Sequence, residues 1–349
     1  MFKKISILVI VLCLTMAVGC RKSTPSLSVD KGDEPSIPEI TVPEEPVYAV
    51  NPLTGLEDLD PQKANQRPVA ITVNNVAVAQ KVQTGLAKAD IVYETEVEGG
   101  ITRLVAVYKD ISDIEKIGTV RSARYAFIDL ALGHNAIYVH HGQDGKYAKP
   151  HLKDVDSFTV SEGKGRGGVR ISNGLAREHT LYAYGDGLWS ALKNAGFKTV
   201  TDNNANWVTF GSEDTPVTLE NIANSVNVPF STSYKTTFKY DTVTQKYIRY
   251  FNGTERKDYN TGKFLYFKNV FVLLTSISDY SDGYHRRVAL EGGEGYYITN
   301  GTYTPIKWIK GSSKNGFKFT RADGTELTVS PGNSWVCLAD KYRAKPIFE

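Results

Sequence analysis

Cysteine is scarce in this sequence, with three in 349 residues. Cys13 lies inside an N-terminal apolar run and Cys20 directly follows it, so Cys337 stands alone in the rest of the chain. A single cysteine excludes an intrachain disulfide and a cysteine-rich metal site in the processed chain. We expect Cys337 to be a small buried apolar side chain rather than a nucleophile.

Long hydrophobic runs are also missing. The longest apolar stretch, residues 5–18, has about 14 residues, whereas a helix that crosses a bilayer needs roughly 20. Lys3 and Lys4 precede it, and it ends in Ala17-Val18-Gly19-Cys20. This is the pattern of a lipoprotein signal peptide. We predict that residues 1–19 are removed and that palmitate-type acyl chains on Cys20 anchor the protein to the outer face of the cytoplasmic membrane.

The chain also lacks a strong excess of positive or negative charge. The 41 basic and 38 acidic residues leave a net charge of +3, which is too small for the strongly basic surface of a nucleic-acid-binding protein. The six histidines form no His-Glu-x-x-His motif, and the chain has neither a Gly-x-Ser-x-Gly nor a Walker phosphate-loop motif. We therefore expect no nucleic-acid partner, no metal and no cofactor.

Residues 21–50 contain five prolines and six acidic residues, and Tyr48 is their only aromatic residue. A segment of this composition buries too little apolar surface to fold. We expect residues 20–50 to form a lipidated, disordered tether that holds the following residues away from the membrane.

The composition changes at Asn51, where periodic apolar patterns begin. Apolar spacing typical of a helix covers residues 125–132, and a second such pattern runs from Asp186 to Gly196. Three runs rich in β-branched and apolar residues predict strands at 69–73, 101–108 and 136–140. Strands that alternate with helices predict an α/β layered domain over residues 51–219.

Residues 220–349 lack helical periodicity and contain many short β-type runs. Asx-Gly pairs, which supply the positive φ angles of tight hairpin turns, separate several of these runs at 252–253, 300–301, 315–316 and 323–324. We expect an all-β antiparallel C-terminal domain, and therefore a mixed α+β protein overall. Tyrosines are frequent in this half, where they either pack in the strands or form a glycan- or protein-binding surface.

Several separated motifs occur in one order along the chain, at residues 51–55 (NPLTG), 84–94, 98–103, 116–124 (KIGTVRSAR), 247–253 (YIRYFNG), 307–310 (KWIK) and 331–335 (PGNSW). Together they closely resemble the YerB-like lipoproteins, which carry an N-terminal and a C-terminal domain of unknown function, the DUF3048 pair. The resemblance implies an envelope lipoprotein with two domains divided near residue 220. It implies no established activity.

The polar residues most suggestive of chemistry are grouped between residues 94 and 124. Arg121 and Arg124 bracket the start of a predicted helix, and Arg103 follows a Gly-Gly turn, which makes all three candidates for binding a phosphate or carboxylate. Glu94 and Glu98, two candidate acid/base groups, lie an even number of residues apart and would share one face of a strand. His179 is the third acid/base candidate. The alternative is that these side chains pair with one another or face solvent.

Two functions remain open at this point. The first is a cell-envelope lipoprotein that binds a cell-wall glycan or an envelope protein. The second is an envelope enzyme that acts on a diphosphate-linked or wall-glycan substrate, with Arg103, Arg121 and Arg124 on the anion and Glu94 or Glu98 as the base. The order of strand, arginine-containing turn, helix and strand is also similar to the LytR-CpsA-Psr envelope enzymes, although Tyr125 stands where those enzymes have an aspartate.

Overall fold

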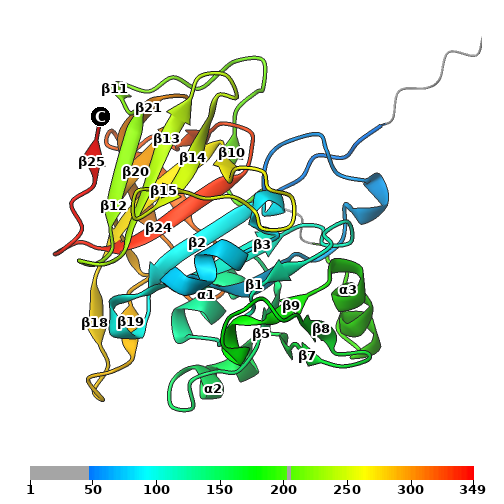
Figure 1. The fold of residues 1–349 in the computed structure, drawn as a ribbon. Coiled ribbons are helices and arrows are strands. Elements are labelled where there is room, and N and C mark those ends of the chain that lie inside the picture. Colours follow the sequence, from blue (N-terminus) through cyan, green and yellow to red (C-terminus); the bar gives the residue numbers. More distant parts are fainter. Residues whose placement is uncertain (1–46, 203–205) are drawn as a thin grey trace, which may run out of the picture. The chain divides into compact units, whose positions relative to one another are not determined.

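The computed structural model describes residues 47–202 and 206–349 (Figure 1). The predicted signal peptide 1–19, Cys20 and nearly all of the tether 20–50 lie outside the described residues. Among the described residues, none of the helices combines the length and the apolar character needed to span a membrane. Residues Val47–Glu349 form one compact unit.

The core of the molecule is a sheet of eleven strands. Its order is β11-β21-β20-β17-β24-β2-β3-β1-β5-β6, with β22 paired to β21. Almost every residue of the central strands is buried, as expected for strands covered on both faces. The strands are β1 (Val69–Asn74), β2 (Ile91–Glu96), β3 (Thr102–Tyr108), β5 (Ile137–His140), β6 (Ser157–Thr159), β11 (Asn221–Ile222), β17 (Asn269–Thr275), β20 (Gly292–Thr299), β21 (Thr302–Ile309), β22 (Lys318–Arg321) and β24 (Ser334–Asp340).

Both halves of the sequence contribute to this sheet. In Figure 1 the red strand β24 runs alongside the cyan strand β2, and the two pair in parallel from Ile91↔Ser334 to Thr95↔Leu338. The boundary expected near residue 220 therefore does not coincide with a break in the sheet. Without β24, strand β2 would have an unpaired edge, which is unfavourable for a buried strand.

A second sheet of six strands covers one face of the large sheet, because Val226, Phe238 and Tyr247 share an apolar cluster with Trp335 and Val272 of the large sheet. Trp335 is central to this contact, with its ring centroid 5.0 Å from that of Phe267. The order is β15-β14-β13-β12-β25, with β16 paired to β14. The strands are β12 (Ser225–Pro229), β13 (Lys235–Asp241), β14 (Lys246–Phe251), β15 (Thr254–Glu255), β16 (Tyr266–Phe267) and β25 (Ile347–Phe348).

Helix α1 (Tyr125–Gly133) packs on the opposite face of the large sheet, where Phe127, Ile128 and Leu130 join the second apolar cluster. Two further helices and a small sheet of order β4-β9-β8-β7 complete this end of the molecule. These elements are α2 (Ala148–His151), α3 (Gly185–Asn194), β4 (Ile117–Gly118), β7 (Ser161–Glu162), β8 (Gly167–Arg170) and β9 (Leu181–Ala183).

Short elements connect the larger ones. Two two-stranded ribbons pair β10 (Thr209–Phe210) with β23 (Thr328–Val329) and β18 (Ile277–Asp279) with β19 (Arg286–Val288). Short 3₁₀ helices are η1 (Pro61–Lys63), η2 (Ala77–Val82), η3 (Leu86–Lys88), η4 (Glu98–Gly100), η5 (Leu152–Asp154) and η6 (Arg177–His179).

The mixed α+β class is confirmed, as are both predicted helices and the three predicted N-terminal strands. Two of the Asx-Gly turns have the expected positive φ angles at both residues, 46° and 81° at 252–253 and 50° and 73° at 300–301. The elements described after residue 220 are all strands. The purely antiparallel pairing expected there is wrong, because β24 pairs in parallel with both β17 and β2.

Candidate functional site

The register between β2 and β3 divides the candidate residues between the two faces of the large sheet. Glu94 is directly opposite Leu104, and Thr95 is directly opposite Arg103. Directly opposed residues share a face and successive residues alternate, so Glu94 and Arg103 point to opposite faces. The sequence-predicted candidates therefore form two groups.

Glu94 lies between the large sheet and the six-stranded second sheet and is fully buried. Its Oε1 accepts hydrogen bonds from Asn75 Nδ2 (2.9 Å) and Thr102 Oγ1 (2.8 Å). Its Oε2 accepts from Trp335 Nε1 (3.1 Å), and the Thr236 hydroxyl donates within 3.0 Å of either oxygen. These donors keep a carboxylate stable in an apolar region, where an unpaired polar group would be costly.

Arg249 is the buried cation beside Glu94, and the sequence analysis did not single it out. Its Nη2 lies 3.9 Å from Glu94 Oε1, and its guanidinium lies 4.6 Å from the centre of the Trp335 ring. Asn75 bridges the pair, since its Oδ1 accepts from Arg249 Nη2 (3.2 Å). Burial lowers the pKa of Arg249 to about 10, so the group remains charged near neutral pH. The arrangement stabilises the contact between the sheets and gives Glu94 no access to a substrate.

Glu98 and Arg124 form the closest ion pair of the second group. Glu98 lies in η4, just beyond β2, and Arg124 is the N-cap residue of α1. The pair is bidentate, with Arg124 Nε 2.6 Å from Oε1 and Nη2 2.7 Å from Oε2. Burial alone would raise the pKa of Glu98, but the hydrogen bonds and charge of Arg124 outweigh burial and lower it. Glu98 is therefore held as a carboxylate that neutralises Arg124 rather than as a free base.

Arg103 and Arg121 lie near this ion pair without a carboxylate of their own. Arg103 is 4% exposed, and its Nη1 donates to the carbonyl of Ser122 (3.1 Å). Arg121 is half-buried, its Nη1 donates to the carbonyl of Glu178 (3.2 Å), and its Nε is buried without a hydrogen-bond partner. Burial, together with the charges of Arg124 and Arg121, lowers the pKa of Arg103 to about 9. We call Arg103, Arg121 and Arg124 the arginine cluster.

Backbone hydrogen bonds fix the loop that carries Arg121 and Arg124. Arg121 N donates to Thr72 O near the end of β1 (3.0 Å), and His141 N, just after β5, donates to Arg121 O (3.0 Å). Strands β1 and β5 are parallel, so their carboxyl ends meet at the same edge of the sheet. In α/β sheets, ligands bind in the crevice outside the carboxyl ends of the strands. The arginine cluster occupies that position.

His179 belongs to the arginine side of the sheet. Its Nδ1 is 2.8 Å from Asn74 Nδ2, and its Nε2 is 3.2 Å from Glu178 Oε1. Burial and the charge of Arg121 lower the pKa of His179, whereas Glu178 opposes this shift. His179 is therefore neutral at pH 7 and lies beside Arg121, whose guanidinium bonds to the Glu178 carbonyl.

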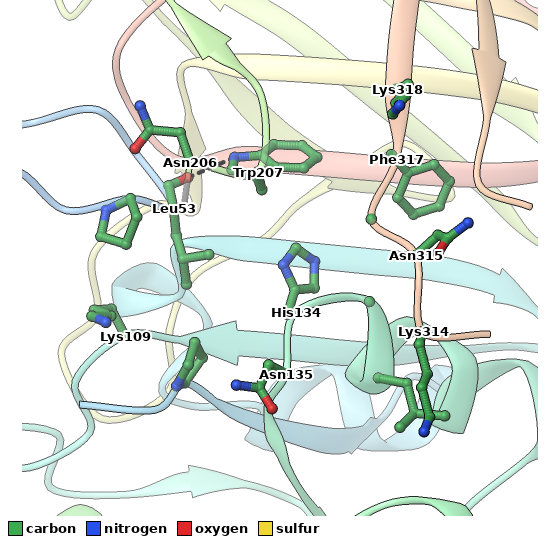
Figure 2. A pocket seen from close by; sticks show the side chains of 15 residues that line it. Leu53, Lys109, His134, Asn135, Asn206, Trp207, Lys314, Asn315, Phe317 and Lys318 are labelled. Atoms are coloured by element: carbon green, nitrogen blue, oxygen red, sulfur yellow. Dashed lines mark hydrogen bonds between the residues drawn. The ribbon is translucent and has the colours of Figure 1, made fainter. Parts of the chain in front are cut away.

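A cavity of about 480 Å³ lies elsewhere, beside the C-terminal end of α1 (Figure 2). Its lining includes Lys109, Lys314 and Lys318 and no acidic residue. Figure 2 shows His134 between Trp207 and Asn135 at its wall. Burial and the charge of Lys310 lower the pKa of His134 to about 3, and Tyr93 bonds to its Nε2 (2.7 Å). The sequence-predicted site residues do not line this cavity.

A metal site is not apparent in the part of the chain that the structure describes. Within residues 47–202 and 206–349, no three His, Cys, Asp or Glu side chains are grouped in a way that would hold a metal ion. Cys337 is fully buried on β24, and burial raises its pKa, which agrees with an apolar packing role.

Comparison with known proteins places this geometry in a family. The profile described as "Protein of unknown function (DUF3048) N-terminal domain" matches residues 53–198, and the DUF3048 C-terminal domain profile matches residues 226–336. The chain is 30% identical over 313 residues to "Putative lipoprotein YerB" of Bacillus subtilis (strain 168), which covers 85% of this chain and 88% of that protein. The crystal structure of the YerB protein from Bacillus subtilis matches with a TM-score of 0.74 and 30% identity, over 86% of this chain and 100% of that one. The chain therefore belongs to the DUF3048 family of YerB-like lipoproteins.

Proposed function

We propose that this protein is a cell-envelope lipoprotein, anchored through acylated Cys20 on the outer face of the cytoplasmic membrane, that binds a phosphate-bearing wall polymer at the arginine cluster. The leader that ends in Ala17-Val18-Gly19-Cys20 supports the anchor. The relation to a protein named as a lipoprotein supports it independently. Finding a diacylglyceryl thioether on Cys20 by mass spectrometry would support the anchor, and an unmodified thiol would refute it.

The proposal of an anionic ligand rests on the excess of positive charge in the arginine cluster. Three guanidinium groups share one carboxylate, Glu98, and among the described residues no other carboxylate lies within 4.0 Å of any of the three. A buried charge without a counter-charge is unfavourable, and a bound anion removes that cost. Arg121 and Arg124 are half-buried and reach solvent, so an anion has access to the cluster.

A phosphate group fits these donors better than a smaller anion does. Guanidinium groups bind phosphate oxygens through paired N–H donors, and the buried Nε of Arg121 is a donor that still lacks a partner. The cluster also adjoins the N-terminal end of α1, which favours negative charge. Outside the cell, phosphodiester polymers of the wall supply this chemistry in a repeating form.

The contacts of the two glutamates favour binding over catalysis. The enzyme alternative needs Glu94 or Glu98 as a base beside the anion. Glu94 faces the other side of the sheet, and Glu98 is engaged by Arg124 through both oxygens. His179 is close to Arg121, but a neutral imidazole bound to Asn74 and Glu178 serves equally as structural support.

The experiment compares Arg121→Gln with Arg166→Gln, a matched change at an exposed arginine in the turn between β7 and β8. The probes are pyrophosphate and poly(glycerol phosphate), measured by titration calorimetry with the full-length chain in detergent. Removing a charged hydrogen-bond donor costs about 1.5–3 kcal/mol, so Arg121→Gln should weaken binding roughly 10- to 100-fold. Arg166→Gln should leave affinity within about twofold. Equal losses in both variants, or no binding by the unchanged protein, would refute the ligand proposal.

A further inference from the structure

A second cavity, of about 440 Å³, lies along α1 and is lined by tyrosines and charged side chains from three parts of the chain. Tyr125 and Asp129 come from α1, Arg287 comes from β19, and Lys310 follows the end of β21. Tyr280 completes this group from the turn after β18. We call this space the tyrosine cavity. It is distinct from the arginine cluster and from the lysine-lined cavity of Figure 2.

The Tyr125 ring is held in place from one side only. It stacks on His151 with ring centroids 4.1 Å apart and an angle of 11° between the planes. His151 is itself fixed at both nitrogens, with Nε2 2.7 Å from Asp129 Oδ1 and Nδ1 2.9 Å from Asp154 Oδ2. Tyr125 nevertheless remains 38% exposed. A rigid aromatic ring with an open surface binds a ligand at a low cost in conformational entropy.

Tyr280 has the same arrangement. Its ring stacks on Tyr147 with centroids 3.8 Å apart and an angle of 14°, and Tyr147 also contacts the edge of His285. Each of the two tyrosines that line the cavity is therefore backed by a second ring. This support distinguishes them from tyrosines that are simply exposed on a strand.

The polar groups of the cavity balance in charge. Lys310 is only 2% exposed, its Nζ donates to the carbonyls of Ser312 (3.3 Å) and Ser313 (2.7 Å), and among the described residues no carboxylate lies within 4.0 Å of it. Arg287 lies 4.0 Å from Glu291, which also lines the cavity. Two cations and the two carboxylates of Asp129 and Glu291 leave no net charge. The cavity thus offers donors and acceptors to an uncharged polar ligand.

We propose that the tyrosine cavity binds an uncharged pyranose sugar. The two backed rings would contact the apolar C–H faces of the sugar, while Asp129, Arg287 and Lys310 would bond to its hydroxyl groups. Tyr125 directly follows Arg124 in the chain, so the cavity and the arginine cluster adjoin at the first turn of α1. One extension of this proposal rests on the proposed function: the sugar and the phosphate would be consecutive parts of one wall polymer.

The test uses probes without phosphate, so that the two proposals fail separately. Chitotetraose and cellotetraose are titrated against the full-length chain in detergent. Tyr125→Ala should weaken binding of at least one of them about tenfold, whereas Tyr125→Phe, which keeps the ring, should stay within about twofold of the unchanged protein. Tyr259→Ala, at a 56% exposed tyrosine away from the cavity, is the matched control and should have no effect.

Cross-measurements separate the sites. Tyr125→Ala should retain pyrophosphate binding, and Arg121→Gln should retain oligosaccharide binding. If the unchanged protein binds neither oligosaccharide at about 10 mM, or if Tyr125→Ala binds as well as the unchanged protein, the sugar site is refuted. If the unchanged protein binds an oligosaccharide but not pyrophosphate, only the arginine-cluster proposal is refuted.

Discussion

The buried pair of Glu94 and Arg249 allows a sharp prediction about stability. Glu94→Gln keeps the size and shape of the side chain but removes the negative charge. Arg249, which is fully buried, would then have no counter-charge, and the Glu94 position would present an amide N–H₂ group where Thr236 and Trp335 both donate. The substitution therefore creates an unpaired buried cation and a clash of donors.

The expected magnitude follows from these contacts. Breaking one partner of a buried ion pair costs about 3–5 kcal/mol. That is a large part of a total stability on the order of 5–15 kcal/mol. For a compact unit that spans Val47–Glu349, where about 1 kcal/mol shifts Tm by roughly 1.5–2 °C, the midpoint should fall by about 5–10 °C. Arg249→Met alone should cost a similar amount, because it leaves the Glu94 carboxylate uncompensated.

The assay is urea unfolding of the four members of a double-mutant cycle. Because both single variants lose the same interaction, the variant with Glu94→Gln and Arg249→Met together should be less destabilised than the sum of the two, by about 1–3 kcal/mol. Glu178→Gln, at a side chain that is 59% exposed, is the control and should stay within about 0.5 kcal/mol. A Glu94→Gln variant as stable as the control, or strictly additive effects, would refute this account of the pair.

Two further predictions concern glycine packing and acid sensitivity. Gly185→Ala should destabilise the fold by roughly 3 kcal/mol or more, because the added Cβ would lie 1.7 Å from the carbonyl oxygen of Ile111. Gly187→Ala, whose added Cβ would have its nearest atom at 3.6 Å, should be neutral or stabilising. Thermal unfolding of both variants checks this prediction. Burial lowers the pKa of His134 from 6.5 to about 3, so its neutral form stabilises the fold above pH 6.5, and this contribution decreases by up to about 1.4 kcal/mol per pH unit as the pH falls toward 3. His134→Gln should therefore lose less unfolding free energy than the unchanged protein between pH 6.5 and 4.5, and equal losses would contradict the argument.

Local signals in the sequence predicted the local elements. The apolar spacing at 125–132 is a property of adjacent residues, and it corresponds to α1. The positive φ angles at Asn252 and Asn300 likewise depend on the residues of the turn itself. The pairing of β2 with β24 joins residues more than 240 positions apart, and nothing in either strand's own composition specifies that partner. For the same reason, Arg249 could not be recognised as the partner of Glu94.

The register between β2 and β3 decides which candidate residues share a face of the sheet, and the sequence does not specify this register. Arg121 and Arg124 were predicted near an anion site because they lie in one loop at a helix start, and the structure places them with Arg103. Glu94 was added to that group on the basis of closeness in sequence. The turn at Gly99 and Gly100, with φ of 71° and 69°, sets the register that places Arg103 opposite Thr95. A slip of one residue would have moved Arg103 to the face of Glu94.

Because both halves of the chain contribute strands to one sheet, a truncation cannot show which half binds a partner. Deleting residues 220–349 is the obvious test of whether the C-terminal half recruits a partner. The deletion would also remove β24 from the edge of β2 and take away Thr236, Arg249 and Trp335, which surround Glu94. In the remaining chain Glu94 would lose half of its donors, and the apolar sheet face and strand edge now covered by the deleted residues would be exposed. Loss of binding by the truncated chain would then reflect unfolding. Arg121→Gln and Tyr125→Ala change half-buried or exposed side chains and leave the sheet paired. These two variants therefore test ligand binding without unfolding the protein.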